Sequence, residues 1–266
     1  MFVKLLVLFL TPLLSGALIY VLPKGKETNF RLLLGFAGSY LFSITIIHIL
    51  PDLYETQIGT EFIGLAVLAG FFLQQFLEYF TAGVEHGHMH AHGHQHDHHH
   101  HDHHDHHHGH VHHHQANRAL SALVLLFALC VHAFLEGAML AKPFHMDTFY
   151  NVNAVLLGIA LHRAPAAFAL MTVLAHQLHS RVKALPHLLV FSFAAPAGLL
   201  LSTYLVNAEI LSATGLVYLY AIVSGNFLHI STTIVFEGSP EHRFDARRMA
   251  VVVLGALAAV AVQYIM

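Results

Sequence analysis

The sequence contains few charged residues. Only 10% of its 266 residues are Asp, Glu, Lys or Arg, whereas 56% are hydrophobic. Soluble domains carry roughly 25% charged residues, so this composition excludes an ordinary soluble domain and predicts an integral membrane protein. Tryptophan is absent, and an aromatic belt at the membrane surface would therefore have to use tyrosine and phenylalanine. We expect the lipid bilayer, and no nucleic acid, among the partners.

Cysteine is almost absent as well. The single cysteine, Cys130, excludes an intrachain disulfide. It lies two residues from His132 and so roughly on the opposite face of a helix, which favours a small buried hydrophobe over a metal ligand. The His-Glu-x-x-His motif of metalloproteases is also missing. We therefore do not expect an enzyme.

Long apolar segments make up most of the chain. Eight segments are each close to the ~20 residues that a membrane-spanning helix requires. They predict an all-α membrane protein with eight transmembrane helices. The segments are about 1–22, 31–51, 60–83, 118–141, 149–178, 186–207, 212–236 and 247–266.

Basic residues fall mainly on one side of this predicted bundle. With the N-terminus outside, only Lys4 and Lys142 lie in outer positions, and nine basic residues lie in inner loops. This is a strong positive-inside pattern, which cleavage of the first segment as a signal peptide would weaken. We therefore expect both termini on the outer side and, without an organellar presequence, a bacterial inner membrane. The nine inner residues are Lys24, Lys26, Arg31, Arg118, Arg181, Lys183, Arg243, Arg247 and Arg248.

A histidine-rich tract separates the third and fourth segments. Residues 85–115 contain 19 of the 28 histidines, interleaved with Gly, Asp, Glu and Gln. Such a composition cannot bury a core, and we predict a disordered cytoplasmic loop over 85–117 that binds zinc or similar ions weakly. The predicted division is therefore helices one to three in 1–84, the loop in 85–117, and helices four to eight in 118–266.

Two ionisable residues lie in the middle of the fourth segment. His132 and Glu136 are four residues apart and share one helix face. Ionisable side chains at membrane depth usually face a protein interior or a water-filled path. The pair is either half of a metal site or a structural polar pair that bonds to neighbouring helices.

The fifth segment places a second polar group at similar depth. His162, Arg163 and Pro165 lie near its middle. The proline frees one backbone carbonyl, and interrupted helices at the membrane midplane are where transporters form binding sites. His132, Glu136 and His162 together make a plausible two-nitrogen, one-oxygen ligand set for Zn²⁺. Arg163 requires a carboxylate or several carbonyl groups as partners.

Five further residues are candidates for an ion path, and the alternative for each is an ordinary polar or interfacial contact. His48 and Asp52 end the second segment on the outer side, where they would suit an entrance. His176 and His179 lie at the inner end of the fifth segment, and His229 lies in the seventh.

This pattern resembles the ZIP family of Zrt/Irt-like metal transporters over nearly the whole chain. The second segment ends in His48-Ile49-Leu50-Pro51-Asp52, which is similar to the family's H-x-x-P-[DE]. The fourth and fifth segments carry His132-Ala133-Phe134-Leu135-Glu136-Gly137 and His162-Arg163-Ala164-Pro165-Ala166, which are similar to the family's two metal-binding motifs.

The resemblance implies an inverted-repeat bundle that carries divalent metal, chiefly Zn²⁺, towards the cytoplasm. Fe²⁺, Mn²⁺ and Cd²⁺ are further candidate substrates. It also implies a homodimer, and movement of helices one, four, five and six against the other four. The family holds two metal ions, but here the positions that would supply the second are Ala133, Arg163, Ala166 and Ala195.

We therefore predict a mononuclear site made of His132, Glu136 and His162. An arginine cannot lose its proton in a protein, so Arg163 beside Glu136 would supply the charge that a second Zn²⁺ otherwise brings. Two other interpretations stay open. One is a membrane protein that binds metal without transporting it, and the other is a metal exporter with a histidine-rich loop.

Overall fold

The computed structural model describes residues 1–21, 27–81, 112–141, 152–237 and 246–265, and these residues are almost entirely helical. All eight predicted segments form helices. The first is α1 (Phe2–Ala17), which ends in a 3₁₀ turn over Leu18–Tyr20. The others are α2 (Glu27–Ile44) continuing into α3 (Leu50–Tyr54), α4 (Thr60–Thr81), α5 (His112–Ala138), α6 (Val152–Gln177), α7 (Arg181–Asn207), α8 (Ala213–Glu237) and α9 (Ala246–Ile265).

Six of these helical segments are long and apolar enough to cross a membrane, and Ala122–Ala138 of α5 is a shorter apolar helix. The prediction of an all-α membrane protein is therefore confirmed. α5 begins at His112, six residues before the boundary that we predicted at 118. Most of the predicted disordered loop lies outside the described residues.

The second span contains a local irregularity that the sequence did not predict. Between α2 and α3 the helix widens into a π-helical turn over Thr45–Ile49. The Thr45 hydroxyl donates to the carbonyl of Leu41, 2.7 Å away. π-turns occur often at functional sites, and this one contains His48.

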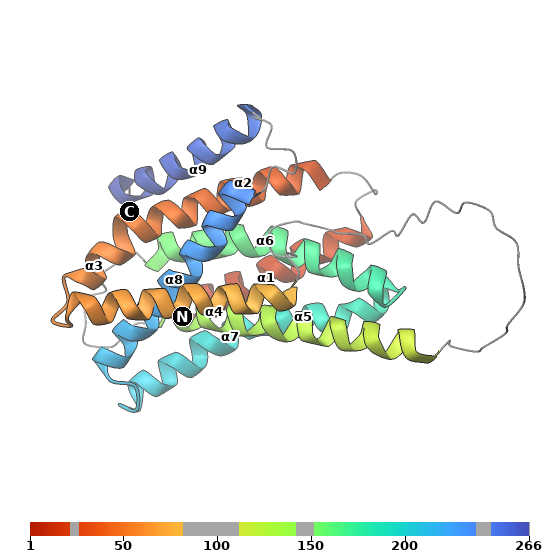
Figure 1. The fold of residues 1–266 in the computed structure, drawn as a ribbon, viewed down its shortest axis with the longest axis horizontal. Coiled ribbons are helices and arrows are strands. Elements are labelled where there is room, and N and C mark those ends of the chain that lie inside the picture. Colours follow the sequence, from red (N-terminus) through yellow and green to blue (C-terminus); the bar gives the residue numbers. More distant parts are fainter. Residues whose placement is uncertain (22–26, 82–111, 142–151, 238–245, 266) are drawn as a thin grey trace, which may run out of the picture.

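The contacts between helices group them into two units. Figure 1 shows α9 beside α2 in one of them. In the first unit, which we call the α5–α7 unit, α5 packs on α7, and α1 packs on both α6 and α7. In the second, the α4–α8 unit, α4 packs on α8, and α2 packs on both α8 and α9. The two units meet mainly where α2 contacts α6 and where α4 contacts α5. The first unit therefore contains the first, fourth, fifth and sixth predicted segments, which are α1, α5, α6 and α7. The second unit contains the other four predicted segments.

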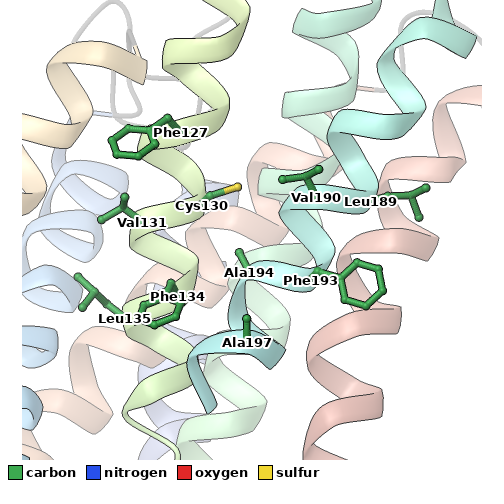
Figure 2. A pocket seen from close by; sticks show the side chains of 10 residues that line it. All are labelled: Phe127, Cys130, Val131, Phe134, Leu135, Leu189, Val190, Phe193, Ala194 and Ala197. Atoms are coloured by element: carbon green, nitrogen blue, oxygen red, sulfur yellow. The ribbon is translucent and has the colours of Figure 1, made fainter. Parts of the chain in front are cut away.

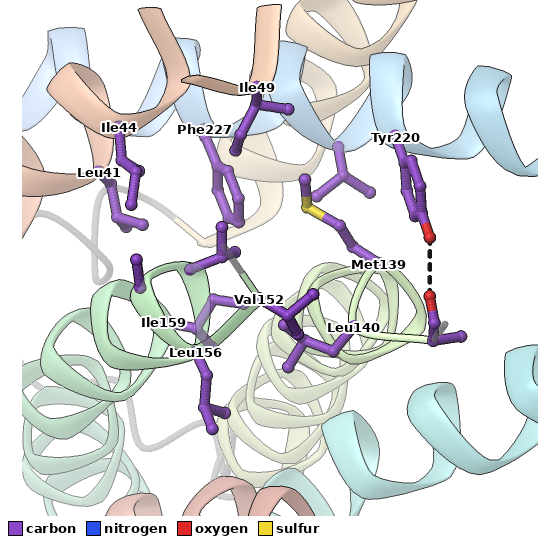
Figure 3. Packing of buried hydrophobic residues seen from close by; sticks show 14 of the residues in the cluster. Leu41, Ile44, Ile49, Met139, Leu140, Val152, Leu156, Ile159, Tyr220 and Phe227 are labelled. Carbon is purple, nitrogen blue, oxygen red and sulfur yellow. Dashed lines mark hydrogen bonds between the residues drawn. The ribbon is translucent and has the colours of Figure 1, made fainter. Parts of the chain in front are cut away.

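A buried apolar cluster joins the two units at the end of the bundle where α5 finishes and α6 begins. Figure 3 shows Leu41 and Ile44 of α2 and Phe227 of α8 facing Met139, at the end of α5, and Ile159 of α6. A second apolar cluster, which includes Leu125, Leu170 and Leu188, lies entirely within the α5–α7 unit. The largest apolar contact between the units is therefore at one end of the molecule.

Two tyrosine hydroxyls reinforce this contact. Tyr220 of α8 donates to the carbonyl of Ala141, just after α5, at 2.7 Å (Figure 3). Tyr40 of α2 donates to the carbonyl of Ala154, near the start of α6, at 3.0 Å. Both tyrosines are almost completely buried, so water cannot replace these bonds.

We expect Tyr220→Phe to lower the stability of the protein by about 1 kcal/mol, because a buried hydrogen bond between the units is lost. The thermal unfolding midpoint in detergent measures the effect. Tyr204→Phe is the matched control, since Tyr204 is largely exposed on α7. Equal midpoints for the two variants would contradict a role for the Tyr220 bond.

Candidate metal centre

The candidate site lies where α5 crosses α7, beside α6. Two glycines allow the helices of this crossing to approach closely. A Cβ atom on Gly137 would collide with the backbone of Ala195 in α7, and one on Gly198 would collide with the backbone of Phe134 in α5. Small residues permit such close helix contacts in membranes. Gly137 directly follows Glu136, so the crossing fixes the backbone next to the carboxylate.

Three potential metal ligands converge there. His132 and Glu136 project from one face of α5, and His162 projects from α6. Each has a ligand atom within 4.8 Å of the others, and all three residues are buried. His132 Nε2 lies 3.2 Å from Glu136 Oε1, and the two imidazole rings meet edge to face at 5.9 Å.

This set is chemically suited to zinc. Imidazole nitrogen and carboxylate oxygen bind Zn²⁺ at about 2.0–2.2 Å, so two ligands of one ion lie at most about 4 Å apart. Small side-chain rotations are therefore enough to bring all three groups onto a single ion. Among the described residues, no other group of three or more His, Cys, Asp or Glu residues is arranged in this way.

Arg163 is the fourth member of the centre. Its side chain is 1% exposed, and one guanidinium nitrogen, Nη1, lies 3.4 Å from Glu136 Oε2. The other, Nη2, donates to the backbone carbonyl of Phe191 in α7 at 3.1 Å. The guanidinium also lies 4.6 Å from the centre of the Phe191 ring. The buried cation thus has the carboxylate and carbonyl partners that the sequence predicted it would need.

The two oxygens of Glu136 face different neighbours. Oε1 points to His132 and Oε2 to Arg163. A metal ion held by Oε1 and the two histidines would therefore leave the contact between Oε2 and the guanidinium in place. Sequence reasoning did not identify Phe191, because its contribution comes from a backbone carbonyl and a ring face, and neither has a sequence signature.

Three alanines fill positions where the resemblance implies ligands for a second ion. Ala133, Ala166 and Ala195 are all buried, and the backbone of Ala195 lies against Gly137. An alanine side chain offers no metal ligand, so these positions cannot bind a second ion.

Cys130 lies on another face of α5, as the sequence predicted. It lines an apolar cavity of about 720 Å³ between α5 and α7, together with Val131, Phe134 and Phe193 (Figure 2). His132 is not among the residues that line this cavity. Cys130 therefore lines an apolar surface and is not a member of the group of three ligands.

The five path candidates lie outside this cluster. His229 of α8 is buried, with Nδ1 3.3 Å from Glu78 Oε2 of α4 and its ring 4.7 Å from that of Phe71. His48, within the π-turn, and Asp52, just after it in α3, are both half-buried. His176 and His179 are exposed at the end of α6, with ring centres 6.4 Å apart. Glu78 is the partner that sequence reasoning did not assign to His229.

Comparison with known proteins agrees with this architecture. A family model described as ZIP Zinc transporter matches residues 1–263. The zinc transporter ZIP9 of Xenopus tropicalis is 36% identical over 127 residues, which cover 45% of this chain and 41% of that protein. The zinc transporter ZIP9 of Macaca fascicularis is 38% identical over 114 residues, which cover 40% of this chain and 47% of that protein. The chain thus aligns with less than half the length of these relatives.

The family model extends over nearly the whole chain, and its match agrees with the helical bundle and the buried histidine and glutamate residues. The chain belongs to the ZIP zinc transporter family.

Proposed function

We propose that this protein carries Zn²⁺ across a membrane towards the cytoplasm through a single-ion site formed by His132, Glu136 and His162. The observation that carries the proposal is the convergence of these three buried ligands at the α5–α6 contact. A protein of this family needs a place to hold its ion away from lipid, and no other described cluster offers one.

Arg163 takes the place of the second metal ion in this proposal. It supplies a permanent positive charge on the side of Glu136 that faces α7. The buried alanines at 133, 166 and 195 supply no further ligands. The combination favours one bound ion, held more weakly than in a two-metal site because the guanidinium repels it.

The path would run through the contact between the two helical units. His48 and Asp52 would form the entrance, and His229, together with Glu78, would receive the ion on the inner half. His176 and His179 would pass it to the histidine-rich loop. Movement of the α5–α7 unit against the α4–α8 unit would expose the site to each side in turn, and the apolar cluster with its two tyrosine bonds would close one side.

The orientation rests on the distribution of basic residues. It places both termini outside and the histidine-rich loop in the cytoplasm. Assignment to a bacterial inner membrane rests on this pattern alone, since the relatives named above come from vertebrates. We also propose a homodimer, and Fe²⁺, Mn²⁺ and Cd²⁺ as competing substrates, from the family resemblance.

Zinc uptake into proteoliposomes tests the function. We expect the native protein to import Zn²⁺, as reported by an enclosed fluorescent indicator, and His162→Ala to reduce the rate to background because one of three ligands is lost. His187→Ala is the matched control. It removes a histidine of α7 whose Nδ1 contacts the Lys183 carbonyl instead.

The same assay separates the alternatives. An exporter would empty preloaded vesicles only when its cytoplasmic face is turned inwards. A protein that binds metal without transporting it would show zinc binding and no flux in either direction, and that result would overturn the proposed function.

A further inference from the structure

Arg163 is anchored from α7 as well as from α5. Its guanidinium donates to the Phe191 carbonyl at 3.1 Å and lies 4.6 Å from the centre of the same residue's ring. Phe191 is 2% exposed, so both contacts are shielded from water and lipid. We propose that Phe191 is a positioning residue, which holds the guanidinium away from the metal position and thereby sets the zinc affinity. This inference rests on the proposed metal site.

The arrangement around Glu136 shows why the position of the cation matters. Glu136 Oε1 faces His132, and Oε2 faces Arg163. A guanidinium can pair with both oxygens of a carboxylate at once. In this structure it does not, because Nη2 is directed to the Phe191 carbonyl. Oε1 is thereby left facing His132, within the group of three ligands where an ion would bind.

Arginine has the donors to adopt the competing arrangement. Nε of Arg163 is buried and donates to no acceptor among the described residues. A rotation of the side chain towards α5 would therefore cost few existing bonds. Two contacts oppose this rotation, and both are made by Phe191. One is the hydrogen bond to its carbonyl. The other is the attraction of the guanidinium to the face of its ring, which is stronger where water is excluded.

The role of α7 follows from this geometry. At the crossing, the backbone of Ala195 lies against Gly137 of α5, and the alanine side chain offers no ligand. One turn earlier, Phe191 provides the carbonyl and the ring. In this chain α7 therefore positions Arg163, whose charge replaces the second metal ion, and does not supply a ligand for that ion.

Phe191→Leu is the direct test, because leucine keeps an apolar side chain and the backbone carbonyl but removes the ring face. Zinc dissociation constants would be measured by calorimetric titration of the full-length protein, with the histidines of residues 86–114 replaced by glutamine in every sample. We expect Phe191→Leu to weaken zinc binding by about tenfold, and Phe191→Tyr, which keeps a ring face, to restore it.

A double-mutant cycle separates positioning from packing. In an Arg163→Gln background there is no cation to hold, so Phe191→Leu should leave the zinc affinity unchanged. Phe193→Leu is the matched control on the same helix. Phe193 is exposed and lines the apolar cavity (Figure 2). Its ring contacts that of Phe9 in α1.

Each outcome is decisive. The positioning role would be overturned if Phe191→Leu bound zinc with native affinity. It would also be overturned if Phe191→Leu lowered the zinc affinity equally in the native and the Arg163→Gln backgrounds. Either result would leave the metal site in place. Absence of zinc binding by the protein with native Phe191 and Arg163 would overturn the metal site and the positioning role together.

Discussion

Replacing Glu136 with glutamine is expected to abolish zinc binding at this centre and to destabilise the protein by about 3–5 kcal/mol. The substitution keeps the size of the side chain but removes the carboxylate of the centre. It also leaves the guanidinium of Arg163, 1% exposed, as a buried cation without its ionic partner, and an uncompensated buried charge carries a cost of this size. Thermal unfolding in detergent and zinc titration measure the two effects.

A double substitution shows whether the unpaired charge of Arg163 causes the loss of stability in Glu136→Gln. Glu136→Gln combined with Arg163→Leu removes both ions, and replacement of a buried ion pair by neutral groups is often close to neutral for stability. We expect the double variant to regain most of the lost stability while still failing to bind zinc at the centre. If the double variant were as unstable as Glu136→Gln alone, the cause would be lost packing at residue 136 rather than the unpaired arginine.

Replacing Arg163 with glutamate is expected to raise zinc affinity by at least about a hundredfold and to allow a second ion to bind. The change removes a fixed positive charge a few ångströms from the ion and adds a carboxylate, and unit charges at such distances interact by several kcal/mol at an effective dielectric constant near 20. Without metal the variant should be less stable, because two carboxylates then face each other in a buried site. Zinc should restore its unfolding midpoint.

The control for this prediction is Arg181→Glu, at the exposed start of α7. It makes the same change in net charge far from the centre, and we expect native affinity and native stoichiometry. If Arg163→Glu also bound one ion with native affinity, Arg163 would not be standing in for a second metal.

Much of the architecture could be predicted from the sequence, because the length and apolar composition of a segment identify a membrane helix. The i, i+4 spacing of His132 and Glu136 placed them on one face of α5, and the short connection to the next helix brought His162 beside them. The structure places these three residues together. That they bind metal stays a prediction.

Other features depend on contacts that leave no pattern in the sequence. The Phe191 carbonyl that accepts from Arg163 belongs to the backbone, which every residue has. The pairing of His229 with Glu78 joins helices far apart in the chain. At Thr45–Ile49 the backbone hydrogen bonds shift locally to form a π-turn. The composition of this segment predicts a regular α-helix and gives no sign of the shift.

The central claim is that one metal ion binds beside an arginine. Anomalous diffraction at the zinc edge, from crystals of the full-length protein soaked in Zn²⁺, tests it most directly. We predict a single peak at this centre, between His132, Glu136 and His162, with Arg163 still paired to the other oxygen of Glu136. No peak there, or a second peak at the position of the guanidinium, would contradict the claim.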